Sequence, residues 1–309
     1  MKIVFMGTPQ AAVPSLLRLI ADGHEVEAVY SQPDRASGRG NKITYSPVKQ
    51  CALDNGIAVC QPEKVRTPEA LETFRSHDAD LAVVVAYGRI LPEAFLNAFP
   101  HGAVNVHFSL LPKYRGAAPV NWAIVNGEKE TGVTTMQMDV GLDTGAMLMQ
   151  RSTPIKSGEN SIELMERLSL IGAELLSESL ANLDSLTPIE QDHAVATLAP
   201  IMKREDGLID WGMSASDIAA RVRGFQPFPS SFTSFRGGKL TFWKAEPTEV
   251  SETFLAGTIL EASNGRLVIG CGDNTALLVG EIQAEGKRRM TVRDFLNGVK
   301  IAVGEQLGK

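Results

Sequence analysis

Cysteine is scarce in this sequence, which limits the chemistry that the chain can carry. The three cysteines, Cys51, Cys60 and Cys271, are odd in number and show no CxxC spacing. A disulfide framework and a structural zinc site both need patterned cysteines, so the sequence argues against both. Thiols without such a pattern are typical of a reducing compartment, and we therefore expect a cytoplasmic protein.

Long apolar runs are also missing. A transmembrane helix needs roughly 20 mostly apolar residues in succession, and no stretch of the sequence approaches that length. Residues 1–7 predict a first strand, whereas a signal peptide would need a longer apolar region and a cleavage site. We therefore expect no membrane partner.

The common nucleotide-binding and hydrolase motifs are absent as well. Gly7-Thr8-Pro9 lacks both the glycine spacing of a dinucleotide-binding loop and the GK[ST] ending of a P-loop. The sequence contains neither a GxSxG elbow nor an HExxH helix. A catalytic function must therefore depend on other residues.

Composition and charge indicate a globular chain of two domains. The 309 residues exceed one average domain, and 44% of them are hydrophobic and 21% charged. The net charge is −6, so the chain as a whole is not a basic nucleic-acid binder. Residues 1–200 have 16 Lys and Arg against 23 Asp and Glu, while residues 201–309 have 14 against 13. The second part could present a favourable face to RNA, although chance variation in surface charge explains these numbers equally well.

Strand and helix patterns alternate in the first half. Residues 80–86 are almost uniformly apolar, as in a parallel strand that is covered on both faces. The other predicted strands are 3–6, 25–30, 103–107 and 132–138, and the predicted helices are 11–21 and 161–183. This alternation predicts an α/β domain with a doubly wound, mostly parallel sheet. Ligands bind beyond the carboxyl ends of such strands, where we expect His107 and the loop after Met138.

The pattern changes after Pro188. A polar stretch is followed by short strands that Gly, Asn and Asp separate, which indicates a smaller C-terminal β-barrel domain of OB-like type. Its predicted strands are 239–244, 257–261, 266–270 and 275–282, followed by a helix at 292–303. The predicted domains are an α/β domain at 1–189, a linker at 190–207 and a barrel domain at 208–309.

Three polar residues of the first domain are candidates for catalysis. Asn105 and His107 alternate in one predicted strand, so their side chains lie on the same side of the sheet. Both can donate a hydrogen bond to an oxygen, and Asp143, in a glycine-rich loop, could orient the imidazole. Such a set is suited to acyl transfer. A histidine at a strand end and an aspartate in a turn are, however, also common structural residues.

The sequence resembles the folate-dependent formyltransferases along essentially the whole chain. The central match is the run at 105–119, Asn-Val-His-Phe-Ser-Leu-Leu-Pro-Lys-Tyr-Arg-Gly-Ala-Ala-Pro. Further matches lie at residues 5–9, 32–35, 38–40, 46–49, 86–92, 136–145, 209–211 and 223–229. The Asn, His and Asp set belongs to the whole superfamily and specifies formyl transfer. The Gly38-Arg39-Gly40 loop, the Gly-Ala-Ala-Pro run and the second domain favour a tRNA as the acceptor.

The resemblance implies the reaction and its participants. The co-substrate would be 10-formyltetrahydrofolate and the acceptor the methionine amino group of initiator methionyl-tRNA, with no metal. Asn105 and His107 would stabilise the oxyanion of a tetrahedral intermediate, and Asp143 would orient His107. The residues that the resemblance assigns to folate binding are Tyr87, Gly88, Ile90, Leu91, Pro92, Ser109, Leu110, Leu111, Pro112, Val140 and Gly141.

A basic loop at residues 32–49 supports the tRNA acceptor. It contains four cations, the last of which is Lys49, and one acid. A positive loop beside an active site suits the acceptor end of a tRNA, and the residues predicted to bind it are Arg35, Arg39 and Lys42. Because little in the loop is apolar, we expect it to become ordered only when tRNA binds. The alternative is a solvated loop without a ligand.

Other functions fit part of the same pattern. A formyltransferase for a small amine, such as a purine ribonucleotide or an amino sugar, would use the same three residues but would not need a separate barrel domain. A hydrolase that releases formate from the folate is a second enzyme alternative. A non-catalytic RNA-binding module is disfavoured by the intact Asn105, His107 and Asp143.

Overall fold

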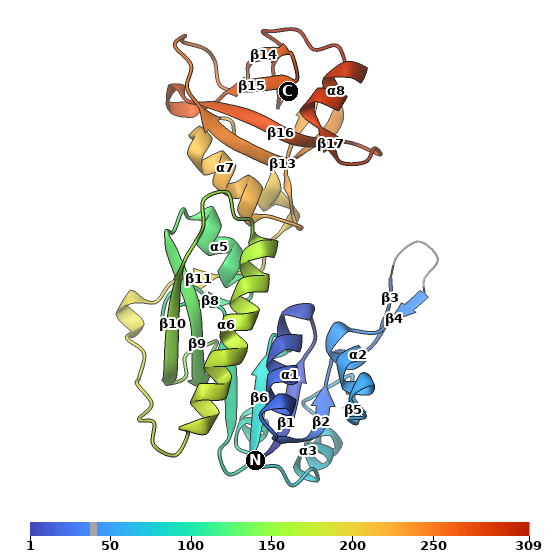
Figure 1. Ribbon diagram of the computed structural model, residues 1–309, viewed down its shortest axis with the longest axis vertical. Coiled ribbons are helices and arrows are strands. Elements are labelled where there is room, and N and C mark those ends of the chain that lie inside the picture. Colours follow the sequence, from blue (N-terminus) through green and yellow to red (C-terminus); the bar gives the residue numbers. More distant parts are fainter. Residues whose placement is uncertain (38–41, 309) are drawn as a thin grey trace. The chain divides into compact units, whose positions relative to one another are not determined.

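The computed structural model describes residues 1–37 and 42–308, and the chain divides into two compact units (Figure 1). The first unit consists of residues 1–119, 130–154 and 165–200, and the second consists of residues 120–129, 155–164 and the chain from 201 onward. The division is therefore not linear along the sequence. The stretch predicted as a linker, 190–207, is shared between the two units.

A seven-stranded sheet with the order β10-β9-β7-β6-β1-β2-β5 forms the centre of the first unit. Its strands are β1 (Lys2–Gly7), β2 (Glu25–Tyr30), β5 (Val59–Cys60), β6 (Leu81–Val85), β7 (Ala103–His107), β9 (Glu130–Gln137) and β10 (Met147–Pro154). Strands β5, β2, β1, β6 and β7 are parallel, whereas β9 is antiparallel to both of its neighbours. The predicted α/β fold with a mostly parallel sheet is confirmed.

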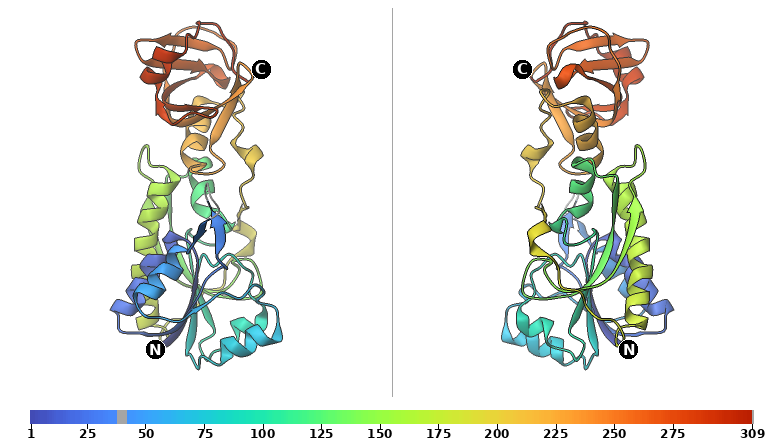
Figure 2. Two further views of the ribbon diagram at one scale, coloured as in Figure 1. Left: turned by 90° about the vertical axis from the view of Figure 1, so that its right-hand side faces the viewer. Right: turned by 90° about the vertical axis from the view of Figure 1, so that its left-hand side faces the viewer.

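Helices cover both faces of this sheet (Figure 2). α1 (Val13–Ala21) and α6 (Ser161–Ala181) lie on one face, and α3 (Pro68–Arg75) and α4 (Glu93–Leu96) lie on the other. Because both faces are covered, every residue of β6 is buried, which explains its uniformly apolar sequence. None of the helices that the structure describes is long and apolar enough to span a membrane.

Short elements complete the first unit. They are the helices η1 (Gln10–Ala12), α2 (Pro47–Asp54) and η2 (His193–Val195), the hairpin of β3 (Arg35–Ser37) and β4 (Lys42–Thr44), and the parallel pair of β8 (Arg115–Gly116) and β11 (Leu198–Ala199). The pair of β8 and β11 joins the stretch after β7 to the stretch after α6. Two regions that lie far apart in the sequence are thereby fixed to each other.

The second unit contains an antiparallel sheet with the order β12-β13-β16-β15-β14, and β17 pairs with β16. Its strands are β12 (Ser231–Phe235), β13 (Gly238–Thr248), β14 (Ile259–Ser263), β15 (Arg266–Gly270), β16 (Ala276–Ala284) and β17 (Met290–Thr291). Its helices are α5 (Pro119–Val125), η3 (Arg204–Gly207), α7 (Ala215–Gly224), η4 (Gly272–Asn274) and α8 (Val292–Gly298). The smaller β domain is confirmed, but among the described residues no pairing closes this sheet into a barrel.

The core of the second unit lies between its sheet and its helices. Ile218 and Val222 of α7 are fully buried in one cluster with Phe242 of β13. Trp211 packs its ring edge-on against Phe242, with the ring centres 5.9 Å apart. α8 ends at Gly298, so it is shorter than the predicted helix at 292–303.

Candidate active site

Two of the candidate catalytic residues lie in β7. Asn105 and His107 are 8% and 5% exposed. In the register of the sheet Asn105 lies opposite Met136 and His107 opposite Thr134 of β9. Since side chains alternate along a strand, both side chains lie on one face of the sheet. The strand prediction at 103–107 thus placed them correctly.

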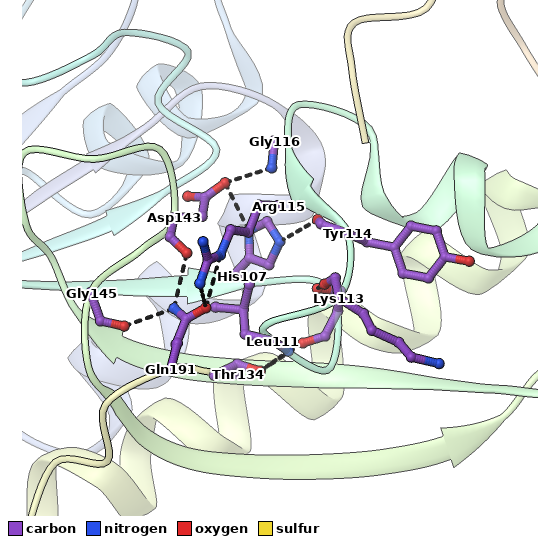
Figure 3. A network of polar contacts seen from close by, with 11 residues as sticks. His107, Leu111, Lys113, Tyr114, Arg115, Gly116, Thr134, Asp143, Gly145 and Gln191 are labelled. Atoms are coloured by element: carbon purple, nitrogen blue, oxygen red, sulfur yellow. Dashed lines mark hydrogen bonds and ion pairs between the residues drawn. The ribbon is translucent and has the colours of Figure 1, made fainter. Parts of the chain in front are cut away.

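Asp143 lies beside His107, in the loop between β9 and β10. Its Oδ2 is 3.6 Å from His107 Nδ1 and accepts a hydrogen bond of 2.8 Å from the main-chain N–H of Gly116 (Figure 3). The first distance is longer than a hydrogen bond, so the two groups are neighbours without a direct hydrogen bond. The structure therefore brings the histidine and the aspartate together, with the aspartate fixed by a main-chain donor.

The path of the Asp143 loop differs from our expectation. Because β9 is antiparallel to β7, its last residue, Gln137, lies opposite Val104, near the start of β7. The loop therefore does not follow the carboxyl ends of the parallel strands, and this expectation was wrong. Since Asp143 reaches the His107 side chain, the loop must turn back over the sheet face that carries His107. Gly145 permits the turn, because a Cβ there would lie 1.8 Å from the Gln137 oxygen.

The second ring nitrogen of His107 is also occupied. Nε2 lies 3.0 Å from the main-chain oxygen of Tyr114. A carbonyl oxygen only accepts, so Nε2 carries the proton in this contact. Each ring nitrogen thus faces an oxygen, one of Tyr114 and one of Asp143, and these two contacts fix the plane of the imidazole.

A buried polar network behind Asp143 was missed by sequence reasoning. Arg115 is 6% exposed and Gln191 is 4% exposed, and the Gln191 amide lies between the Arg115 guanidinium and the Asp143 loop (Figure 3). Arg115 Nη1 also lies 3.1 Å from His193 Nδ1. The only sequence signal was the family match at Tyr114-Arg115-Gly116. Gln191 and His193 belong to the stretch that we predicted as a linker.

The loop after β6, which the resemblance assigns to folate binding, combines buried and exposed apolar residues. Tyr87 and Leu91 are 2% and 5% exposed, whereas Ile90 is 64% exposed. Burial raises the pKa of the Tyr87 phenol, which keeps it neutral. The Tyr87 main-chain oxygen accepts hydrogen bonds from Thr8 Oγ1 and Gln32 Nε2. These hydrogen bonds fix the main chain of the loop at Tyr87, while the side chain of Ile90 remains accessible.

The other residues assigned to folate binding divide in the same way. Ser109 is fully buried and donates its hydroxyl to the Lys113 oxygen at 2.7 Å, and Leu111 is 3% exposed. Val140 is 66% exposed. Ser109 and Leu111 shape the loop from inside, so contact with a ligand would depend on the exposed residues. The assignment as a whole stays a prediction.

One cavity is lined in part by the Tyr87–Pro92 loop. It has a volume of about 430 Å³ and is lined by Lys64, Val65, Arg66, Thr67, Arg89 and Ile90. Arg89 reaches out of this loop and donates from Nε to Gln32 Oε1 at 2.9 Å. Three of the six lining residues are cations, so the cavity is suited to an anionic group.

The basic loop at 32–49 is described only in part. Arg39 lies outside the described residues, while Arg35 and Lys42 lie on the paired strands β3 and β4. The base of the loop therefore has regular structure. Lys49 belongs to α2, and its Nζ lies 2.5 Å from Asp34 Oδ2. Asp34 therefore neutralises Lys49, which was not among the residues predicted to bind tRNA.

Comparison with known proteins gives the class. The sequence model described as formyl transferase matches residues 1–180, and the model described as formyl transferase, C-terminal domain, matches residues 201–300. The chain is thus a member of the formyl transferases in both of its parts.

Relatives of known name match the full chain. The methionyl-tRNA formyltransferase of Solibacter usitatus is 48% identical over 311 residues, which cover 100% of this chain and 99% of the relative. That of Citrifermentans bemidjiense is 49% identical, with 100% and 97% covered. The chain therefore belongs to the methionyl-tRNA formyltransferase family, and the family predicted from the motifs is confirmed.

Solved structures share the fold at low identity. An N-formyltransferase from Helicobacter canadensis, in complex with folinic acid and dTDP-3-aminofucose, has a TM-score of 0.65 at 20% identity, with 90% of this chain and 98% of that chain covered. HypX from Aquifex aeolicus in complex with tetrahydrofolic acid has a TM-score of 0.64 at 17% identity, with 96% and 47% covered. The arrangement of elements thus recurs in both of these structures.

Proposed function

We propose that this protein transfers the formyl group of 10-formyltetrahydrofolate to the methionine amino group of initiator methionyl-tRNA. The observation that carries the proposal is full-length identity of 48% to 49% with methionyl-tRNA formyltransferases, together with the buried His107 and the partly buried Asp143 beside it. We place the reaction in the cytoplasm.

The proposed chemistry is acyl transfer through a tetrahedral intermediate. When the amine attacks the formyl carbon, the formyl oxygen becomes an oxyanion. Asn105 can donate from its amide, and His107 can donate from Nε2 once the formyl oxygen replaces the Tyr114 oxygen as its acceptor; both side chains lie on the same sheet face. Donors that are fixed in a buried site stabilise such charge strongly, because they need no reorganisation when it forms. We therefore assign the oxyanion to these two residues.

Asp143 supports His107 and assists the proton transfer. The attacking amine must lose a proton and the leaving folate nitrogen must gain one. The distance of 3.6 Å between Asp143 and His107 leaves room for these groups to approach when substrate binds, as catalytic hydrogen bonds often do. No metal has a role in this mechanism.

The residues present are suited to hold a folate. Ile90 and Val140 provide exposed apolar surface beside glycines at 88 and 141, where main chain can approach a flat ring closely. Met138 packs against the core cluster that contains Tyr87 and Leu91, so the two loops share one support. The folate supplies the formyl group, and the chain orients it.

The tRNA acceptor end is assigned to the loop at 32–49, with Arg39 as its main residue. Gly38 and Gly40 on either side give Arg39 an adaptable main chain. A guanidinium can bridge phosphate oxygens or stack on an unpaired base, which Lys does less well. Arg39→Ala should weaken the use of methionyl-tRNA at fixed salt, Arg39→Lys should restore it in part, and folate affinity should stay unchanged in both. Unchanged use of tRNA by Arg39→Ala would show that the loop is merely solvated.

The proposal is tested by offering several acceptors with formyl-labelled 10-formyltetrahydrofolate. We expect label on initiator methionyl-tRNA and none on a purine ribonucleotide or an amino-sugar nucleotide. Equal transfer to a small amine would support the alternative formyltransferase, and release of labelled formate without an acceptor would support the hydrolase. Binding of tRNA without any transfer would leave only the RNA-binding function.

A further inference from the structure

The side chain of Gln191 uses all of its hydrogen-bonding groups within the first unit (Figure 3). Its Nε2 donates to the main-chain oxygens of Asp143 at 2.9 Å and of Gly145 at 2.8 Å. Its Oε1 accepts from Arg115 Nε at 3.0 Å and from Nη2 at 2.7 Å. A carboxamide has two donor hydrogens and two acceptor positions, so each is satisfied. A buried amide with four directed contacts is a rigid connection.

These contacts close a ring around Asp143. Gly116 donates its main-chain N–H to the Asp143 carboxylate at 2.8 Å, and its neighbour Arg115 is bound to Gln191. Gln191 in turn binds the main chain of Asp143. The carboxylate and the main chain of Asp143 are thus held from two adjacent residues of β8, one directly and one through Gln191.

The main-chain conformation of Asp143 explains why these hydrogen bonds are needed. Its φ is +52°, in the left-handed region that residues with a side chain adopt at a cost. Gln191 binds the carbonyl oxygens on both sides of Thr144, which fixes the turn. The position of Gln191 is itself fixed, because β11 pairs with β8 and Arg115 donates its main-chain N–H to the Thr197 oxygen at 2.9 Å.

We propose that Gln191 is a positioning residue for formyl transfer, which acts by holding Asp143 at His107. The proposal rests on the role proposed for Asp143. Gln191 has no part in the chemical step, because its amide is fully engaged with the protein. Its effect is on the rate of the step and not on the binding of folate.

The variant Gln191→Glu tests whether Gln191 affects the rate of the chemical step or the binding of folate. It keeps two acceptor contacts with Arg115, which supports folding, but places a carboxylate oxygen against the two carbonyl oxygens that Nε2 now binds. We expect kcat to fall at least about tenfold, because misplacing a catalytic group by about 1 Å costs up to roughly a hundredfold. Binding of folinic acid should change less than about twofold, since a group that acts only in the chemical step affects kcat and not affinity. Gln283→Glu is the matched control, since Gln283 Nε2 also donates to a main-chain oxygen and its Oε1 also accepts from a side-chain N–H; it should keep wild-type kcat.

The double variant with Asp143→Asn decides whether Gln191 acts through Asp143. If it does, Gln191→Glu should slow the Asp143→Asn enzyme by less than about twofold, because residues that act as a unit are not additive. Additive losses, an unchanged kcat in Gln191→Glu, or a loss of folinic acid binding equal to the loss of kcat would overturn the proposal. Full activity of Asp143→Asn alone would instead refute the role of Asp143. If Gln191→Glu does not fold, Gln191→Met replaces it in the comparison with Asp143→Asn. Methionine fills a similar space and adds no charge.

Discussion

Two carboxylates in the loops of the first unit are held in opposite ways. Asp143 is bound by the main-chain N–H of Gly116, and its Oδ2 lies 3.6 Å from His107 Nδ1. Asp34 lies against Lys49 at 2.5 Å and accepts from Gln61 at 2.9 Å. Lys49 neutralises one charge, whereas neutral groups hold the other in place. If Asp143 acts on His107 as we propose, its charge has to stay uncompensated, and the manner in which each carboxylate is held then separates a functional carboxylate from a structural one.

The largest expected effect is at the two residues that we propose as oxyanion donors. His107→Ala and Asn105→Ala should each lower formyl transfer by roughly a hundredfold or more, the usual scale for the loss of an oxyanion donor. Turnover with initiator methionyl-tRNA at saturating folate measures this. Circular dichroism must show a folded protein, and a folded variant with nearly full turnover would refute the assignment.

The comparison itself is tested by making the same substitution at both carboxylates. Asp143→Asn keeps the shape of the side chain but removes its charge, so turnover should fall about tenfold or more while folate binding persists. Asp34→Asn should keep turnover with a saturating acceptor within about twofold of the wild type, because Lys49 already neutralises the Asp34 carboxylate. Equal losses in the two variants would mean that the manner in which a carboxylate is held has no bearing on catalysis.

Low pH should destabilise the contact between Asp34 and Lys49 in the loop at residues 32–49. The hydrogen bond from Lys49 lowers the pKa of Asp34 below its usual value. The stabilisation is therefore fully present above the unfolded-state pKa of about 3.9 and is lost as pH falls through the lower, folded pKa. Limited proteolysis at residues 32–49 should become faster below about pH 4 in the wild type. Asp34→Asn should be cleaved faster already at pH 6, and a wild type with no pH dependence would contradict the prediction.

The smallest effect is expected at a neutral pair near the start of the same loop. Tyr30 Oη and His77 Nε2 lie 2.9 Å apart, and burial lowers the pKa of His77. Protonation then favours the unfolded chain, so this contribution is complete above about pH 6.5 and declines as pH falls toward the folded pKa. His77→Gln should make the free energy of unfolding less dependent on pH in urea titrations between pH 7 and 5. Burial also lowers the pKa of His24, so His24→Gln serves as the parallel measurement, and an unaltered slope in His77→Gln would count against this reading.

The strands that carry the site could be predicted because their signal is local. β7 and β2 were predicted with the bounds that the structure gives, since their apolar pattern reflects burial within the strand itself. The direction of β9 could not be predicted, because a strand that is covered on both faces has the same composition whether it runs parallel or antiparallel. The turn of the Asp143 loop over the sheet follows from that direction, and it was missed for the same reason.

Sequence patterns could not predict the contacts of Gln191 or the segments that form the second unit. The Gln191 Nε2 donates to main-chain oxygens 46 and 48 residues away, and any residue type supplies such oxygens. Residues 120–129 and 155–164 likewise belong to the second unit through tertiary contacts. The composition changes at Pro188, but a change of composition does not show which segments pack into the same structural unit.

The pairing of β8 with β11 has a consequence for the order in which the protein is made. Arg115 and Gly116 find their strand partners, Leu198 and Ala199, only after more than 80 further residues have been joined to the chain. A nascent chain that has emerged through Asp143 has the three residues that we propose for catalysis, but it lacks the segment that pairs with β8. If these residues act as we propose, activity should appear only once the segment through Ala199 has left the ribosome and paired with β8.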